Sequence, residues 1–156
     1  TGVVVVASGA KSILDVGATL ERLDTLGVPV WGYRTKQFPG FYLSDSGYAL
    51  DWSLESPDDV AAAFTAHRLV STTGALLAQP IARERQLDPA LHDAALAAAL
   101  AVVEARGVRG KDVTPVLLEE FARHSGGVSV QVNRDLVVAN ARLAGAVAHS
   151  LTSSAS

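Results

Sequence analysis

A run of four valines, Val3 to Val6, followed by Ala7, is the feature that most restricts how this chain can fold. β-Branched residues without polar alternation are typical of a strand covered on both faces, and therefore of the interior of a largely parallel sheet. Leucines at helical spacing follow as far as Gly27, which is placed to end a helix, and Val28–Tyr33 predicts a second strand. The opening of the chain is therefore interpreted as a β-α-β unit.

The rest of the chain predicts two more short strands and four more helices. The strands are expected at Tyr48–Leu54, where Leu50, Trp52 and Leu54 alternate, and at Gly74–Gln79, which Pro80 ends. Helix starts are marked at Ser56-Pro57, Asp88-Pro89 and Thr114-Pro115, with ends near Val70, Gly107 and Gly126, and a last helix is expected from about Ser129 to His149. Residues 151–156 are predicted to form a disordered tail. The predicted class is α/β, in three α/β/α layers with a mostly parallel or mixed sheet.

Composition excludes several classes of function. The chain has 156 residues, 13 basic and 16 acidic side chains and a net charge of −3, without a basic run, so no nucleic-acid partner is expected. It has no cysteine, which rules out disulfides and thiolate metal sites and favours a reducing compartment. The opening apolar run is far shorter than the ~20 residues of a membrane helix. No membrane association is expected, and the predicted location is the cytoplasm.

Lys11 lies where the first strand gives way to a helix. The carboxyl ends of parallel strands are where open α/β sheets bind ligands. Gly9 and Ala10 would let a ligand approach the backbone, and Ser8 and Ser12 add hydroxyl groups near a helix start, although the spacing is not that of a Walker loop. A lysine in a pocket can form a Schiff base with an open-chain sugar aldehyde, whereas a solvated lysine at a strand end would have no such role.

Asn133 and Asn140 lie seven residues apart, within or beside the apolar stripe of the last helix. A buried asparagine amide needs hydrogen-bond partners, so each residue either ties the helix to a neighbour or binds a ligand in a polar pocket.

Other polar residues are less informative. Lys36 is a rival amine on a loop, and the aromatic residues between 31 and 52 are interpreted as anchors of the core and of the loop. The histidines are isolated in sequence and are expected to be exposed; they are His67, His92, His124 and His149.

An ordered series of motifs runs through almost the whole chain. It comprises GAKSILD at 9–15, GVPV at 27–30, FP-x-FY at 38–42, SP at 56–57, VTP at 113–115, GG-x-S-xxx-N at 126–133 and LVVANARLA at 136–144. The series resembles the C-terminal half of the pseudouridine-5′-phosphate glycosidase family, which includes the indigoidine synthase A-like proteins. By this resemblance, residues 1–150 form the C-terminal portion of a single α/β glycosidase domain that is incomplete without an N-terminal half.

The resemblance implies an enzyme that reversibly cleaves the C–C bond between uracil and ribose 5-phosphate through a sugar Schiff base. It places Lys11 as the lysine that forms the Schiff base and Asn133 as the asparagine that hydrogen-bonds the uracil ring. Asn140 matches the second member of a family asparagine pair and is assigned a structural role.

The resemblance also implies partners and a cofactor that lie outside this chain. Family members have an N-terminal half with a metal-binding aspartate, a further acid and most phosphate contacts, so a manganese ion is expected there and no metal ligand is assigned here. A homotrimer is implied. We expect a segment of the N-terminal half to pair beside Val3–Ala7.

Three departures from the family pattern leave the acceptor ring open. Ala7-Ser8-Gly9 stands where the family often has CAG, Gln79 replaces an asparagine before proline, and Ala139 interrupts the asparagine pair. One alternative is therefore a C-glycosynthase that joins ribose 5-phosphate to an aromatic polyketide. A second is a noncatalytic structural or sugar-phosphate-binding fragment.

Overall fold

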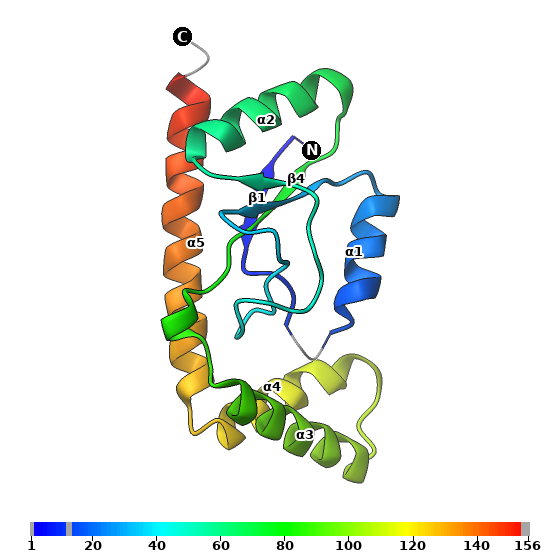
Figure 1. The fold of residues 1–156 in the computed structure, drawn as a ribbon. Coiled ribbons are helices and arrows are strands. Elements are labelled where there is room, and N and C mark those ends of the chain that lie inside the picture. Colours follow the sequence, from blue (N-terminus) through cyan, green and yellow to red (C-terminus); the bar gives the residue numbers. More distant parts are fainter. Residues whose placement is uncertain (1, 12–13, 154–156) are drawn as a thin grey trace.

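The computed structural model describes residues 2–11 and 14–153 (Figure 1). Its strands are β1 (Val4–Ala7), β2 (Val30–Tyr33), β3 (Ser53–Leu54) and β4 (Ala75–Ala78), which form a four-stranded sheet in the order β1-β4-β2-β3 with every pairing parallel. Its helices are α1 (Val16–Thr25), α2 (Pro57–Val70), α3 (Pro89–Ala105), α4 (Val113–His124) and α5 (Val128–Ser153), with short 3₁₀ turns at Arg83–Arg85 and Gly110–Asp112.

The sheet lies between two layers of helices, as the sequence predicted. Alternate residues of β4 point to opposite faces, so Leu76 and Ala78 pack in the cluster that includes Leu20 of α1. Leu77 packs on the other face with Phe64 of α2 and Leu143 of α5. Figure 1 shows α1 on one side of the strands and α5 on the other. The three-layer α/β/α arrangement is therefore confirmed.

The predicted helix starts are confirmed where a side chain caps the backbone. The Ser56 hydroxyl accepts a hydrogen bond from the Asp59 N–H at 3.1 Å, and the Asp88 carboxylate accepts one from the Leu91 N–H at 2.9 Å. The first helix begins at Val16, because the Asp15 carboxylate accepts the Ala18 N–H at 2.9 Å.

The predicted strand at Tyr48–Leu54 is mostly wrong. Only Ser53 and Leu54 pair with β2, and Trp52 is 67% exposed instead of lying on a buried face with its neighbours. The reason is that the earlier residues bond to the preceding loop: the Leu50 N–H donates to the Lys36 carbonyl at 2.8 Å. Local pairing across the loop therefore replaces pairing with the sheet.

One further expectation is corrected at the carboxyl end of the chain. α5 continues to Ser153, so residues 151–153 are helical and not part of a disordered tail; residues 154–156 lie outside the described residues.

β1 was predicted as an interior strand with a segment of an N-terminal half beside it, and that second neighbour stays a prediction. Among the described residues β1 pairs with β4 alone. Val3 and Val5 are consequently 46% and 50% exposed.

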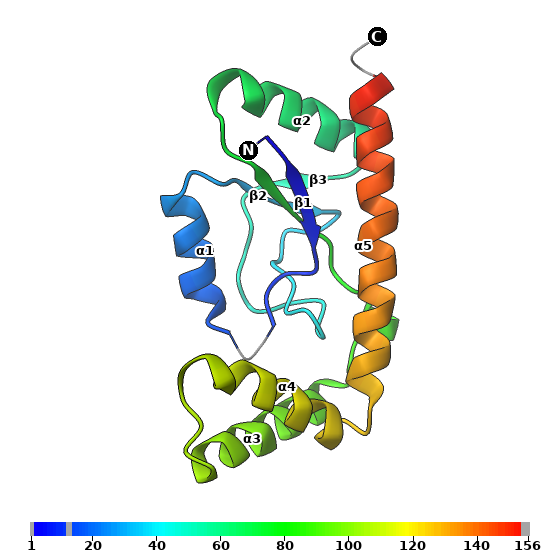
Figure 2. The same cartoon turned by 180° about the vertical axis from the view of Figure 1, so that it is seen from behind.

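α3 and α4 pack against each other at the carboxyl end of the strands, toward which β1 points (Figure 2). Their shared core contains Ala95, Ala99, Leu117 and Phe121, and it includes Tyr42 from the loop that follows β2. The helix pair therefore supports the loop next to the strand ends, where a ligand site was predicted.

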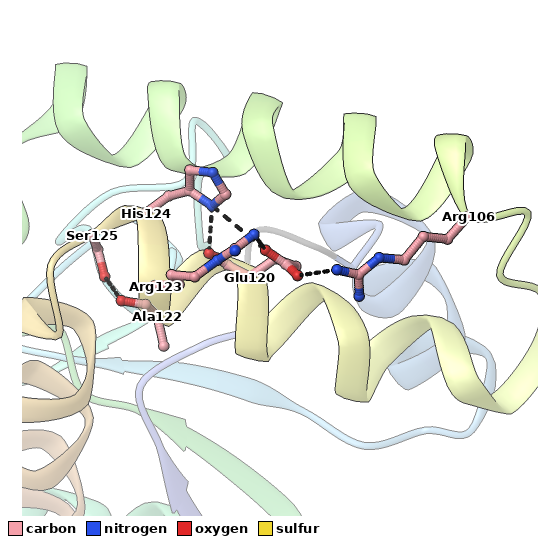
Figure 3. A network of polar contacts seen from close by, with 6 residues as sticks. All are labelled: Arg106, Glu120, Ala122, Arg123, His124 and Ser125. Carbon is pink, nitrogen blue, oxygen red and sulfur yellow. Dashed lines mark hydrogen bonds and ion pairs between the residues drawn. The ribbon is translucent and has the colours of Figure 1, made fainter.

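Glu120 is a buried carboxylate that ties α3 to α4 (Figure 3). It is 3% exposed, pairs with Arg106 at the end of α3 at 3.1 Å, and forms a second, shorter pair with Arg123. The His124 Nδ1 lies 2.7 Å from the Glu120 backbone carbonyl. A buried carboxylate needs such partners, because burying an unpaired charge is strongly unfavourable.

Replacing Glu120 with alanine should lower the free energy of unfolding by about 2 kcal/mol, since it leaves two arginines without their buried partner, although both reach solvent. Glu119→Ala is the matched control, because Glu119 is exposed on the same helix. Denaturant unfolding followed by circular dichroism measures both variants. Equal stability of the two would contradict the role of the Glu120 pairs.

Candidate functional site

The turn after β1 places Lys11 at the carboxyl end of the sheet, as predicted. Ser8 and Ala10 are buried, at 2% and 8% exposure, and Lys11 is half-buried. Ser12 and Ile13, predicted to belong to an anion-attracting turn and the following helix, lie outside the described residues. The Leu14 N–H donates to the Lys11 carbonyl at 2.8 Å.

Gly9 allows this turn to lie directly against the loop of residues 34–47. Its φ is +81°, and a Cβ built on it would lie 1.7 Å from the Pro39 carbonyl oxygen. Gly9 also forms an isolated antiparallel bridge with Gly40. Any other residue at position 9 would push the loop away, so the glycine fixes the distance between the lysine turn and the loop.

The Phe41 ring lies under the Lys11 amine. The Lys11 Nζ is 5.2 Å from the centre of the ring, within cation–π distance. The Phe41 N–H donates to the Ser8 carbonyl at 3.0 Å, and its φ of +63° is unusual for a residue with a side chain and unfavourable by about 1–2 kcal/mol. From the sequence, Phe41 was expected only to anchor the loop. The FP-x-FY motif contained this residue, but nothing in the motif indicated its contact with the lysine.

An aromatic stack connects Phe41 to the helix pair. Tyr42 meets the Phe41 ring edge-on, at 4.9 Å and 89°, and stacks on Phe121 of α4 at 4.9 Å and 13°. His92 of α3 then contacts Phe121 at 5.6 Å. Burial raises the pKa of the Tyr42 hydroxyl, so this ring stays neutral in the stack.

Asn140 has the structural contact that was assigned to it. Its side-chain N–H donates to the Ser8 hydroxyl at 3.0 Å, so α5 is tied to the residue that follows β1. Asn133 lies two turns earlier on α5 and is half-buried. No hydrogen bond joins Lys11 to Asn133 within the described ranges.

A pocket of about 450 Å³ opens at the same end of the sheet, between the strand ends and α5. Its polar lining includes Ser8, Arg34, Gln79, Arg85, Asp135 and Asn140. The Oε1 atom of Gln79, a residue that lines this pocket, is buried and has no hydrogen-bond partner among residues 2–11 and 14–153. Lys11 does not line this pocket.

The remaining candidates are placed as follows. Lys36 is exposed on the loop. His92 is only 4% exposed, which corrects the prediction that every histidine is exposed, because it packs beneath Phe121 and its Nδ1 lies 2.9 Å from Asp93. In the part of the chain that the structure describes, no group of three or more histidine, aspartate or glutamate side chains could hold a metal. These residues therefore do not fit a manganese site, and no step is assigned to a metal here.

The described helices include none long and apolar enough to cross a membrane.

Comparison with known proteins gives one consistent family. The family described as "Indigoidine synthase A like protein" matches residues 1–150. The chain belongs to this family. It is 51% identical over 150 residues to the pseudouridine-5′-phosphate glycosidase of Salinispora tropica, and 52% identical over 147 residues to that of Frankia alni.

A solved structure of a C-glycosynthase has the same fold. The prealnumycin C-glycosynthase AlnA, in complex with ribulose 5-phosphate, superposes with a TM-score of 0.88 at 37% identity over 96% of this chain and 50% of AlnA. The alignments to the two glycosidases cover 95% and 94% of this chain but 46% and 41% of the relatives. The chain thus spans about half the length of the curated relatives it matches.

Gly9→Ala should lower the free energy of unfolding by about 3 kcal/mol or more, because it combines an unfavourable positive φ with a clash against the Pro39 carbonyl. Gly47→Ala is the matched control: its φ of +84° is similar, but a Cβ there meets nothing within 4 Å, so the expected loss is about 1–2 kcal/mol. Denaturant unfolding of both variants isolates the close approach. Equal losses of stability in the two variants would show that the close approach of Gly9 to the Pro39 carbonyl does not contribute.

Proposed function

We propose that the chain is the C-terminal half of an enzyme that reversibly cleaves the C–C bond of pseudouridine 5′-phosphate, giving uracil and ribose 5-phosphate. The observation that carries this proposal is Lys11, half-buried on an aromatic ring at the carboxyl end of a parallel sheet, in a chain about half identical to pseudouridine-5′-phosphate glycosidases.

A lysine suits this reaction because a C–C glycosidic bond has no heteroatom leaving group to protonate. The Lys11 amine displaces the ring oxygen from C1, so the sugar ring opens and C1 carries a secondary amine. The nitrogen lone pair then forms an iminium at C1 as the bond to uracil breaks, and the electron pair of that bond stays with the departing ring carbon, which takes up a proton. Hydrolysis of the iminium returns the amine and releases ribose 5-phosphate.

Asn133 is the proposed contact to the acceptor ring. An amide side chain offers both a donor and an acceptor, which match the alternating carbonyl and N–H groups of uracil. Its half-buried position at the start of α5 is compatible with reaching a ligand, in contrast to Asn140, which is already bonded to Ser8.

The proposal predicts that Lys11 is the site of a covalent sugar adduct. Incubation of the purified protein with ribose 5-phosphate and borohydride should add a reduced sugar-phosphate mass to the peptide that contains Lys11, because borohydride converts the iminium to a stable amine. Lys11→Arg should give no adduct and no cleavage of pseudouridine 5′-phosphate. Peptide-mapped mass spectrometry and uracil release measure the two effects.

Asn133→Ala separates the sugar step from the ring step. It should still form the adduct with ribose 5-phosphate but lose at least about tenfold in uracil release, since only the ring contact is removed. Unchanged uracil release by this variant would contradict the role of Asn133. An adduct on Lys36 instead of Lys11 would contradict the proposed mechanism.

A C-glycosynthase is the second candidate, favoured by the 0.88 TM-score to AlnA and by an unpartnered Gln79 amide in the neighbouring pocket. It shares the lysine chemistry but would join ribose 5-phosphate to an aromatic polyketide. Product formation with a phenolic ring acceptor, together with failure to cleave pseudouridine 5′-phosphate, would favour it.

The same proposal includes an N-terminal half, supplied within a longer chain or as a separate one, that pairs along β1. Support comes from the edge of β1 opposite β4, which has no partner strand among the described residues, and from the exposed side chains of Val3 and Val5. The manganese ion and the homotrimer implied by the family resemblance belong to this proposal, as does a cytoplasmic location, where phosphorylated sugars are retained.

Charge introduced on the β1 edge should break this association. Val5→Lys should separate the two halves, or, within one chain, lower the melting temperature by several degrees, because it places an ammonium group in the paired edge. Val137→Lys is the control, since Val137 is 61% exposed on α5. Copurification shows whether the two halves stay associated, and light scattering gives the mass of the assembly. A catalytically silent protein without an N-terminal half would favour the noncatalytic fragment.

A further inference from the structure

Phe41 is held in an unfavourable conformation by its surroundings. Its φ of +63° is a region that non-glycine residues enter rarely and that persists only where other contacts fix it. Two contacts do so: its N–H donates to the Ser8 carbonyl at 3.0 Å, and the edge of the Tyr42 ring meets its ring at 4.9 Å. Such residues cluster at functional sites.

Filling the core explains only part of the position of this ring, because Phe41 packs at the margin of the cluster shared by α3 and α4. Phe38, three residues earlier on the same loop, is 1% exposed and belongs to the buried cluster beside α1. Phe41 is only half-buried and lies with its ring 5.2 Å from the Lys11 Nζ. The face of an aromatic ring attracts a cation, so the ring gives the lysine ammonium a defined position.

The Phe41 ring can attract the positive charge at the lysine nitrogen both before and after the sugar binds covalently. Formation of the iminium consumes the lysine ammonium and the sugar aldehyde and gives one iminium and one water, so a single positive charge remains at the same nitrogen before and after. A lysine side chain has four flexible carbon–carbon bonds, and its amine is spread over many positions unless a contact selects one. The contact with Phe41 selects the position at the strand end.

We propose that Phe41 is a positioning residue, which holds the Lys11 nitrogen over its ring face for attack on the sugar aldehyde and for stabilisation of the resulting iminium. This inference rests on the proposed function, because it assigns Phe41 a part in the Lys11 reaction. The stack of Tyr42 on Phe121 at 4.9 Å supports the ring from α4, so the helix pair contributes indirectly to the position of the amine.

The test replaces Phe41 with phenylalanines that carry one, two or three ring fluorines. Fluorination weakens the negative face of the ring and leaves its shape and the backbone strain almost unchanged, so folding is preserved. The rate of borohydride trapping with ribose 5-phosphate, per folded protein, should fall with each fluorine, to about one-fifth or less with three. The fall should appear in the rate at saturating sugar, with little change in the half-saturating concentration.

Two controls separate charge from packing. Trifluorophenylalanine at Phe64 alters a buried ring on the other face of the sheet, which contacts His67 and not the aromatic stack of Phe41, and should leave trapping unchanged. Phe41→Leu should slow trapping about tenfold and Phe41→Trp should restore it, because tryptophan offers a stronger ring face in the same strained position.

Each outcome decides between the two proposals. Trapping that is constant across the fluorine series, with a normal adduct in the unmodified protein, would overturn the role of Phe41 and leave the Lys11 mechanism intact. Absence of any adduct in the unmodified protein when the N-terminal half is present would overturn the proposed function, and this inference with it.

Discussion

The contact of Gly9 with the Pro39 carbonyl is the constraint on which the arrangement of this site depends. Without a side chain at position 9, the turn after β1 lies directly on the loop of residues 34–47, and the Ser8 carbonyl comes within hydrogen-bond distance of Phe41. Tyr42, which follows Phe41, stacks on Phe121 of α4, and the ion pairs of Glu120 with Arg106 and Arg123 hold α3 and α4 together. The position of the Lys11 amine thus reflects a chain of contacts from three separate parts of the sequence.

Much of the fold could be predicted because its signals are local. The opening valines, the proline-marked helix starts at Ser56 and Asp88, and the glycines that end helices each act within one turn of the backbone, and the structure follows them closely. Predictions failed where a distant or unexpected partner decided the outcome. Trp52 is exposed because the residues before it pair with the loop, and His92 is buried because α3 packs beneath Phe121. Neither partner can be read from spacing along the chain.

The place of the candidate lysine in the fold was predictable, but the geometry around it was not. The place of Lys11 at a strand end, and its motif, indicated a reactive amine, whereas the ring beneath it comes from a loop thirty residues later, in a left-handed conformation that no propensity predicts. Asn140 shows the reverse case: two residues 132 positions apart form a hydrogen bond that a buried amide requires, although its partner, Ser8, could not be named in advance. The site is therefore defined by long-range contacts that only the folded chain brings together.

The central position of β4 determines when this sheet can form during synthesis. β1 and β2 both pair with β4, which ends at Ala78, so neither has that neighbour until this residue has left the ribosome. Until then the apolar opening strand has two open edges, and α5, which covers it, comes last. A nascent chain of this kind exposes strand edges for a long part of its synthesis. A chaperone, or a segment synthesised earlier, that binds the edges of β1 at this stage would protect the chain from aggregation.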